Sequence, residues 1–263
     1  MPIYTYSVID SKDAINENII GLEEAGVYNV PYRDIGLAVS EIRERIQEIT
    51  DASVLKHEKI IETLMTKFTV LPIRFLTIFN TKEDLLSMVE FFYQDFKANL
   101  IKLRKKVEFG IKVIWHADTI MQRAAGVYHK TKHNISVSTD SPAKTFVKEK
   151  FEKYIIDKEF EKEANRCIAV VDEYFNKIAV EKKLKKLQTN NLLLNAAYLV
   201  EIDRQNDFKQ AFEQLKNAPS DLKFLFSGPW PCYNFISLTK KPSSLNYFNT
   251  GDMLRRLLKT QDL

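Results

Sequence analysis

The sequence predicts an α+β protein with two domains, and three observations lead to this prediction. The chain has 263 residues, which is long for a single compact core. Segments in which apolar residues alternate with a period of two, typical of strands, are interspersed with segments of helical period. Apolar residues make up 45% of the chain and charged residues 28%, as in ordinary globular proteins. We place the domains at residues 1–117 and 118–263.

The first domain is predicted to contain strands at 3–9, 27–31, 35–40, 71–79 and 107–115. An amphipathic helix is expected over 53–68. A second helix follows the N-cap Thr81, with Glu83 and Asp84 favourably placed at its positive end. The order β-β-β-α-β-α-β predicts an elaborated ferredoxin-like sheet with its helices on one face.

The opposite face of this predicted sheet is a mixed aromatic, aliphatic and basic surface. Period-two alternation assigns to it Tyr4, Tyr6, Val8, Arg74, Leu76, Ile78, Lys112 and Ile114. Such a face is too apolar to be left in water without a reason. We expect it either to pack against the second domain or to dock another protein. Arg74 would then be a binding residue, or the partner of a carboxylate such as Glu108.

The second domain is predicted to open with a helix at 118–130. Ser141-Pro142 has the pattern of an N-cap followed by proline, and it begins a long charged helix that reaches about Leu187. This helix carries an apolar stripe at heptad spacing, which lines either a helical hairpin within the chain or a coiled coil with a partner chain. The favoured interpretation is the hairpin, formed with the helix at 118–130. The stripe consists of Phe160, Ala164, Cys167, Val171, Tyr174 and Ile178.

The remainder of the second domain is predicted to form a small antiparallel sheet with one helix. The lysine run at 182–186 suits the negative end of the long helix. Beyond it we expect a strand at 192–202, a helix at 204–217, and strands at 222–228 and 233–239. The last two strands flank Gly228-Pro229-Trp230-Pro231, where two prolines stiffen a corner that carries a large ring. Residues 253–258 would form a short amphipathic helix or an apolar tail.

No catalytic motif is found, so we expect a protein that is not an enzyme and needs no cofactor or metal. His57-Glu58 lacks the second histidine four positions on that a zinc-protease helix needs, so a cap or a surface salt bridge is expected for His57. His129 and His133 have metal-ligand spacing but no carboxylate or cysteine at ligand spacing beside them. Cys167 and Cys232 are too few for a disulfide framework and are expected to be buried apolar residues.

Neither the net charge nor the hydropathy of the chain indicates a nucleic-acid or membrane partner. The net charge of +4 is mild, and no apolar run is long enough to span a bilayer. An RNA-binding module is the weaker alternative, because Phe109 and Trp115 fall on the helix-packed face of the predicted sheet and not on an open one. A ligand-binding or regulatory protein, or an enzyme, built on ferredoxin-like domains is a further alternative.

Several segments together resemble the gas vesicle accessory proteins of the F/L family. They occur in the family's order at 3–9, 32–40, 57–65, 70–79, 107–115, 194–200 and 224–238. The chain departs from the family at Leu76, where glycine is more usual, at Cys232, where a second proline is common, and between about 118 and 143.

This resemblance implies a gas vesicle accessory protein that acts through its surfaces. Its expected partners are the very apolar gas vesicle shell protein and other accessory proteins, and its expected location is the gas vesicle or the cytoplasm. We expect a monomer or weak self-association, without nucleic acid or membrane. The candidate protein-binding residues are Arg74, Leu76, Ile78, Trp230 and Tyr233. Whether the role is that of an F or an L protein stays open.

Overall fold

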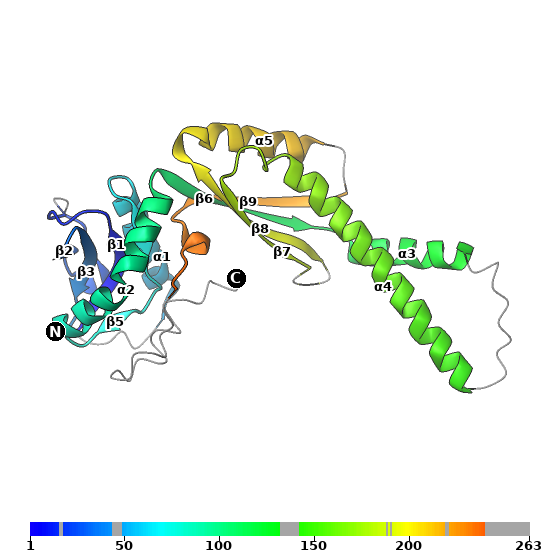
Figure 1. Ribbon diagram of the computed structural model, residues 1–263, viewed down its shortest axis with the longest axis horizontal. Helices are drawn as coiled ribbons and strands as arrows, with labels where there is room; N and C mark the ends of the chain where they lie inside the picture. Colours follow the sequence, from blue (N-terminus) through cyan, green and yellow to red (C-terminus); the bar gives the residue numbers. More distant parts are fainter. Residues whose placement is uncertain are drawn as a thin grey trace. The chain divides into compact units, whose positions relative to one another are not determined.

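The computed structural model describes residues 1–15, 18–43, 49–131, 142–187, 189, 191–218 and 221–239 (Figure 1). The chain divides into two compact units. Unit 1 comprises Met1–Glu108 and Pro229–Leu263, and unit 2 comprises Phe109–Gly228. The predicted domain division after residue 117 remains a prediction, because a compact unit is not by itself an independently folding domain.

The predicted α+β class is confirmed, with two antiparallel sheets and five α-helices in the described part of the chain. Unit 1 contains a sheet of five strands with the order β2-β3-β1-β4, in which β5 also pairs with β1. These strands are β1 (Ile3–Ile9), β2 (Tyr28–Tyr32), β3 (Ile35–Glu41), β4 (Val70–Pro72) and β5 (Ile78–Phe79). A 3-10 turn, η1 (Leu22–Glu24), precedes β2.

Strand β1 is buried along its whole length but is not a regular strand. Its register with β3 shifts between Thr5 and Ser7, so Tyr6 is an extra residue in the ladder. The shift changes which later residues share a face with Tyr4 and Tyr6. Ile9 belongs to their hydrophobic cluster, whereas Val8 does not. The expectation that Val8 shares their face was therefore wrong.

The predicted strand at 71–79 is interrupted. β4 and β5 both pair with β1, and a turn lies between them in which the backbone N–H and the hydroxyl of Thr77 both donate to the carbonyl of Arg74. Leu76 in this turn has a φ of 66°, in the left-handed region that favours glycine. A continuous alternation of side chains cannot be maintained through such a turn.

Two helices pack on the sheet of unit 1. α1 (Asp51–Met65) begins with a capping box between Thr50 and Ser53, and α2 (Lys82–Leu103) begins at Thr81, whose hydroxyl accepts from the N–H of Asp84 as predicted. The hydrophobic cluster around Tyr4 and Tyr6 contains α1 residues and none from α2, so the two helices lie on opposite faces (Figure 1). α1 covers the face that the sequence predicted to be open. The prediction that both helices pack on one face of the sheet was therefore wrong.

The ferredoxin-like arrangement is not confirmed. Its last strand was expected to be 107–115, and this segment is β6 (Lys106–Ile114), which belongs to the second sheet. Lys112 and Ile114 therefore do not extend the surface formed by β1. The period-two alternation itself is present, because Val107, Phe109, Ile111, Val113 and Trp115 are all buried.

The sheet of unit 2 has the strand order β7-β8-β6-β9. Its other strands are β7 (Glu181–Lys186), β8 (Leu192–Glu201) and β9 (Lys223–Trp230), and its helix α5 (Gln205–Asn217) follows β8. The core is a cluster of rings: Phe208 of α5 lies 4.9 Å from Phe109, 4.7 Å from Phe175 and 5.5 Å from Tyr198, measured between centroids. These four rings are all fully buried.

Two segments of the second sheet differ from the prediction. The lysine run expected at a helix end is β7, an edge strand, where charged side chains discourage pairing with another sheet. Lys182 forms an ion pair with Asp172, and Lys186 donates to Asn165. The predicted strand at 233–239 is instead a 3-10 turn, η4 (Tyr233–Phe235), followed by four residues without regular secondary structure.

The long helices of unit 2, α3 (Ala117–Thr131) and α4 (Pro142–Glu173), contact each other within one chain. α4 ends at Glu173, so Tyr174 and Ile178 of the expected heptad stripe lie beyond it, and the coiled coil is not confirmed. The residues buried along this stretch are Phe160, Ala164, Ile168, Val171 and Phe175. The predicted N-cap Ser141 and the predicted helix or tail at 253–258 lie outside the described residues. None of the described helices is long and apolar enough to cross a membrane.

Candidate functional site

The core of unit 1 contains a buried histidine whose hydrogen bonds fix its tautomer. Nε2 of His57 lies 3.0 Å from the carbonyl oxygen of Ile73, which can only accept, so Nε2 carries the proton. Nδ1 must then accept from the hydroxyl of Tyr4 at 2.9 Å. The Tyr4 oxygen in turn accepts from the backbone N–H of Leu76 at 3.1 Å. His57 is thus neither a cap nor a surface ion-pair partner, as the sequence had suggested, but a link between α1 and the turn after β4.

Burial determines the protonation of this pair. Desolvation lowers the pKa of His57 to about 4, and it raises the pKa of Tyr4. His57 is 2% exposed. At neutral pH both groups are uncharged, and every polar atom of the imidazole has a partner. The pair therefore acts as a rigid structural link.

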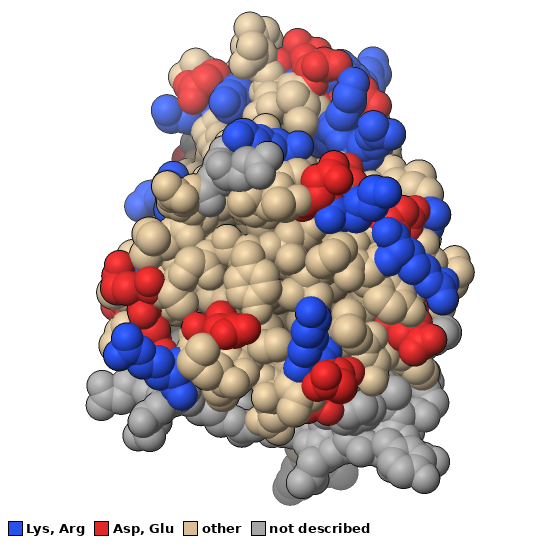
Figure 2. Space-filling view, turned by 90° about the vertical axis from the view of Figure 1, so that its left-hand side faces the viewer, with Lys and Arg blue, Asp and Glu red and all other residues tan. Residues whose placement is uncertain are grey.

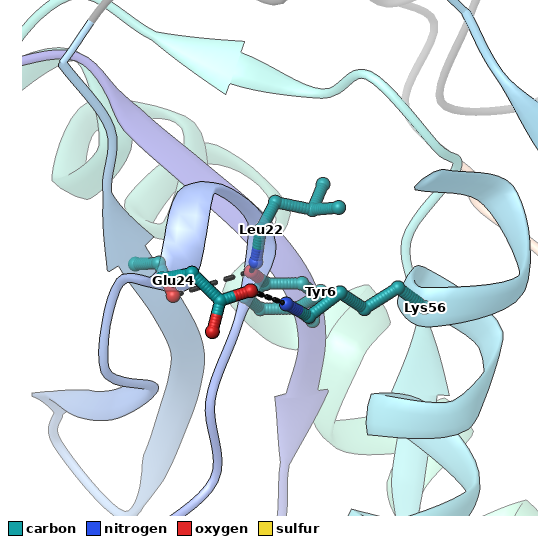
Figure 3. A network of polar contacts seen from close by, with 5 residues as sticks. Tyr6, Leu22, Glu24 and Lys56 are labelled. Atoms are coloured by element: carbon teal, nitrogen blue, oxygen red, sulfur yellow. Dashed lines mark hydrogen bonds and ion pairs between the residues drawn. The ribbon is translucent and has the colours of Figure 1, made fainter. Parts of the chain in front are cut away.

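Tyr6 forms a second buried link beside the first. Its hydroxyl accepts from the N–H of Leu22 at 2.9 Å and donates to Ser40 at 3.2 Å, which ties η1 to the sheet (Figure 3). At the surface above it, the Lys56 ammonium of α1 lies 2.6 Å from the Glu24 carboxylate. Two tyrosines of β1 thus hold two loops, at 22 and at 76, by their backbone N–H groups.

Three of the five candidate binding residues lie in the turn that Tyr4 holds. Arg74 is exposed, and Leu76 and Ile78 are half-buried. Leu76 and Ile78 pack against the cluster that contains Tyr4 and Tyr6. Leu76 keeps its left-handed backbone conformation at a cost of about 1 kcal/mol for a residue with a Cβ atom. This observation gives a physical reason for the usual glycine at this position in the family that the sequence resembles.

The other two candidates, Trp230 and Tyr233, also belong to unit 1, and both are half-buried. Tyr233 packs against the same cluster as Leu76 and Ile78, so the structure brings these three residues to one core. Burial, with the nearby carboxylates of Glu58 and Glu108, raises the pKa of Tyr233. Gly228, two residues before Trp230, has a positive φ of 109°, a backbone conformation that glycine adopts without strain.

The segment after the corner is held by a polar clamp, which we define as Asp95, Asn99 and Glu108. Asn99 accepts from the N–H of Ser237 at 3.0 Å and donates to its carbonyl at 2.7 Å. Asp95 accepts from the N–H of Thr239 at 3.0 Å and from its hydroxyl at 2.7 Å. Each clamp residue is less than a tenth exposed. The clamp fixes residues 234–239 along α2.

Glu108 completes the clamp by accepting from the backbone N–H of Asn234 at 2.8 Å and from its side-chain amide. A pairing of Arg74 with Glu108, the alternative that the sequence offered, stays a prediction. Sequence reasoning missed this clamp. The available signal was the placement of Asp95 and Asn99, polar residues four positions apart, among the apolar residues of α2.

The two cysteine thiols are reactive side chains, and both are at least partly shielded from water. Burial raises the pKa of the Cys232 thiol to about 12, and its sulfur lies 3.6 Å from the carbonyl of Lys106. Cys167 is half-buried, with a raised pKa. The described residues contain no group of three His, Cys, Asp or Glu side chains that could hold a metal ion. His133, and the side chain of His129, lie outside what the structure describes.

The fold and this site define a two-unit α+β protein in which buried side chains hold backbone turns in place. The family model described as gas vesicle synthesis protein GvpL/GvpF matches residues 2–237. The chain therefore belongs to the GvpL/GvpF family, and its role is related to gas vesicles.

Curated relatives and solved structures agree with this assignment. Gas vesicle protein F2 of Halobacterium salinarum is 24% identical over 240 residues, which cover 90% of this chain and 92% of that protein. Gas vesicle protein F of Haloferax mediterranei is 24% identical over 242 residues, with 90% and 93% covered. The crystal structure of GvpF from Microcystis aeruginosa has a TM-score of 0.79 at 20% identity and covers 90% of this chain and 99% of its own. This last likeness shows the fold.

Proposed function

We propose that this protein is a non-catalytic accessory factor in gas vesicle assembly that binds the apolar shell protein and other accessory proteins. The family assignment supports the process, since the matched model is described as a gas vesicle synthesis protein. The physical account is that the protein covers apolar surface of a shell subunit before the subunit polymerises. Covering this apolar surface would suppress aggregation of the shell subunits. Releasing the subunits at the growing shell would then supply them for polymerisation.

The observation that carries the proposed site is the turn at 74–78. It presents an exposed arginine and a half-buried leucine on backbone that is held in a left-handed conformation by Tyr4. Backbone strain of this kind persists only where the surroundings impose it, and it is common at binding sites. Tyr233 packs on the same core, and Trp230 precedes it on the stiff corner, so we propose Arg74, Leu76, Ile78, Trp230 and Tyr233 as one binding region.

The surface of unit 1 on the side that carries β2 and β3 is also suited to a partner with little charge. Figure 2 shows a broad area on this side without lysine, arginine, aspartate or glutamate, bordered by charged residues. A wide uncharged surface with a charged border is a common form of protein–protein interface. This surface supports the proposal that the partner carries little charge. The five residues named above remain the proposed contact.

Co-expression with a tagged gas vesicle shell protein tests the proposal. We expect the shell protein to co-purify with this protein and to shift into the soluble fraction. Arg74→Ala combined with Leu76→Ala should reduce retention several-fold, whereas Leu55→Ala combined with Ile101→Ala, two exposed apolar residues of α1 and α2, should not. Circular dichroism of each variant establishes that it is folded.

The outcomes separate the site from the function. If retention survives alanine at all five proposed residues, the site is wrong and the assembly role stands. If the folded wild-type protein retains neither the shell protein nor another accessory protein, the assembly role is wrong. That result would favour the alternative of a ligand-binding or regulatory protein. A trapped intermediate of a covalent reaction would contradict the non-catalytic role.

A further inference from the structure

The first half of α4 exposes more large apolar side chains than any comparable stretch of the described chain. Phe146, Val147, Phe151 and Tyr154 are 59%, 65%, 56% and 55% exposed. In Figure 1 this half of the helix extends away from the sheet of unit 2. Exposed large apolar residues gathered within nine residues of one helix are a marker of an interaction surface.

These residues form a stripe with the spacing of a coiled-coil seam. Val147, Phe151 and Tyr154 follow one another at steps of four and three, and Lys158 continues the pattern with its ammonium 5.8 Å from the ring centroid of Tyr154. The exposure of the three apolar residues means that α3 does not cover them. The residues that α4 buries, from Phe160 onward, lie further along the helix.

The charges along α4 indicate what covers the stripe. Residues 142–153 carry four lysines and two glutamates, whereas residues 157–163 carry four acidic residues and two lysines. Two copies of the helix in antiparallel orientation would place the basic half of each against the acidic half of the other. A parallel arrangement would place like charges together.

We propose that the stripe Val147, Phe151 and Tyr154 binds the same stripe of a second copy of this chain in an antiparallel helix pair. The two-fold axis passes between Phe151 and Tyr154, so that Phe151 of each copy contacts Tyr154 of the other. Lys150 of each copy then lies near Asp157 of the other. The pairing is isologous and closes at a dimer. It is independent of the proposed binding region in unit 1.

Sedimentation velocity over a wide range of protein concentration tests this pairing. The wild-type protein should show a concentration-dependent dimer, and Phe151→Glu with Tyr154→Glu should raise the dissociation constant at least about tenfold, because four carboxylates would meet at the axis. Ile101→Glu, at an exposed apolar position of α2, is the matched control and should leave the dimer unchanged.

Charge exchange distinguishes a second copy from another occupant. Lys150→Glu and Asp157→Lys should each weaken the dimer, and the two together should restore it. A wild-type protein that is monomeric at every concentration overturns the proposal. So does a dimer that survives both glutamates at the stripe, or a double exchange that fails to restore it, because the stripe would then face a different partner.

Discussion

Unit 1 places buried aromatic side chains in hydrogen bonds with backbone groups, whereas unit 2 stacks its aromatic side chains on one another. Tyr4 and Tyr6 each accept from the N–H of a loop residue, and His57 holds a third backbone group. In unit 2, Phe208 stacks on Phe109 and packs at a tilt against Phe175, and these contacts are between rings. Hydrogen bonds are directional and fix a loop in one place, while ring contacts contribute burial without selecting a loop conformation. The difference suits unit 1 to presenting a defined turn.

The largest expected effect on stability comes from removing one ring from the aromatic core of unit 2. Phe208→Ala removes a fully buried ring that contacts four others, so we expect it to lower the free energy of unfolding by about 3–5 kcal/mol. Urea unfolding gives the change, and hydrogen exchange should locate it in unit 2. Leu225→Ala on β9, at a side chain that is 55% exposed, is the control and should cost little. Equal costs for the two variants would contradict the stacked core.

An intermediate effect should appear in unit 1 as pH falls. The pKa of His57 is lowered by burial from 6.5 to about 4, so between these values the unfolded chain holds a proton that the folded chain does not. Stability is therefore full above pH 6.5 and falls as pH decreases toward 4, by about 3 kcal/mol in total.

Urea unfolding at a series of pH values measures this dependence. Other groups also titrate in acid, so the informative quantity is the difference between the wild-type protein and His57→Gln, in which the histidine contribution is absent. Leu55→Ala, at an exposed apolar residue of α1, is the control and should leave the wild-type slope unchanged. If His57→Gln keeps that slope as well, the neutral buried imidazole is the wrong description.

The smallest expected effect concerns the polar clamp. Asn99→Ala leaves the N–H and carbonyl of Ser237 without their side-chain partner, and we expect a loss of about 1–2 kcal/mol because water compensates in part. Hydrogen exchange at Ser237 and proteolysis of the 232–239 segment should both become faster. Asn99→Asp keeps an acceptor for Ser237 N–H but sets a buried carboxylate against the Ser237 carbonyl, so it should destabilise at least as much as Asn99→Ala. Unchanged exchange in both variants would show that the clamp does not hold this segment.

Features that depend on neighbours in sequence could be predicted. Thr81 caps α2, the apolar residues of α2 recur at helical spacing, and the alternation along β6 is buried on the expected side. The family could also be recognised from short segments in a fixed order. Each of these signals lies within a few residues, where propensity and period act directly.

Features that depend on distant partners could not be predicted. Asn99 meets Ser237, which is 138 residues away, and neither residue has a local pattern that names the other. The left-handed turn at Leu76 depends on Tyr4, 72 residues earlier. The run of lysines at 182–186 is compatible with a helix end by charge, and only its pairing with β8 makes it a strand.

By itself, then, the sequence determined the α+β class, most of the elements, the family and the chemistry of the side chains. The tertiary structure decided which sheet received β6, which face α1 covered, and which polar residues became a clamp. The physical reason is that backbone hydrogen bonds between strands are the same for almost any side chain, so the choice of partner strand leaves little trace in the local sequence. That choice is made by the burial of surface contributed from many parts of the chain at once.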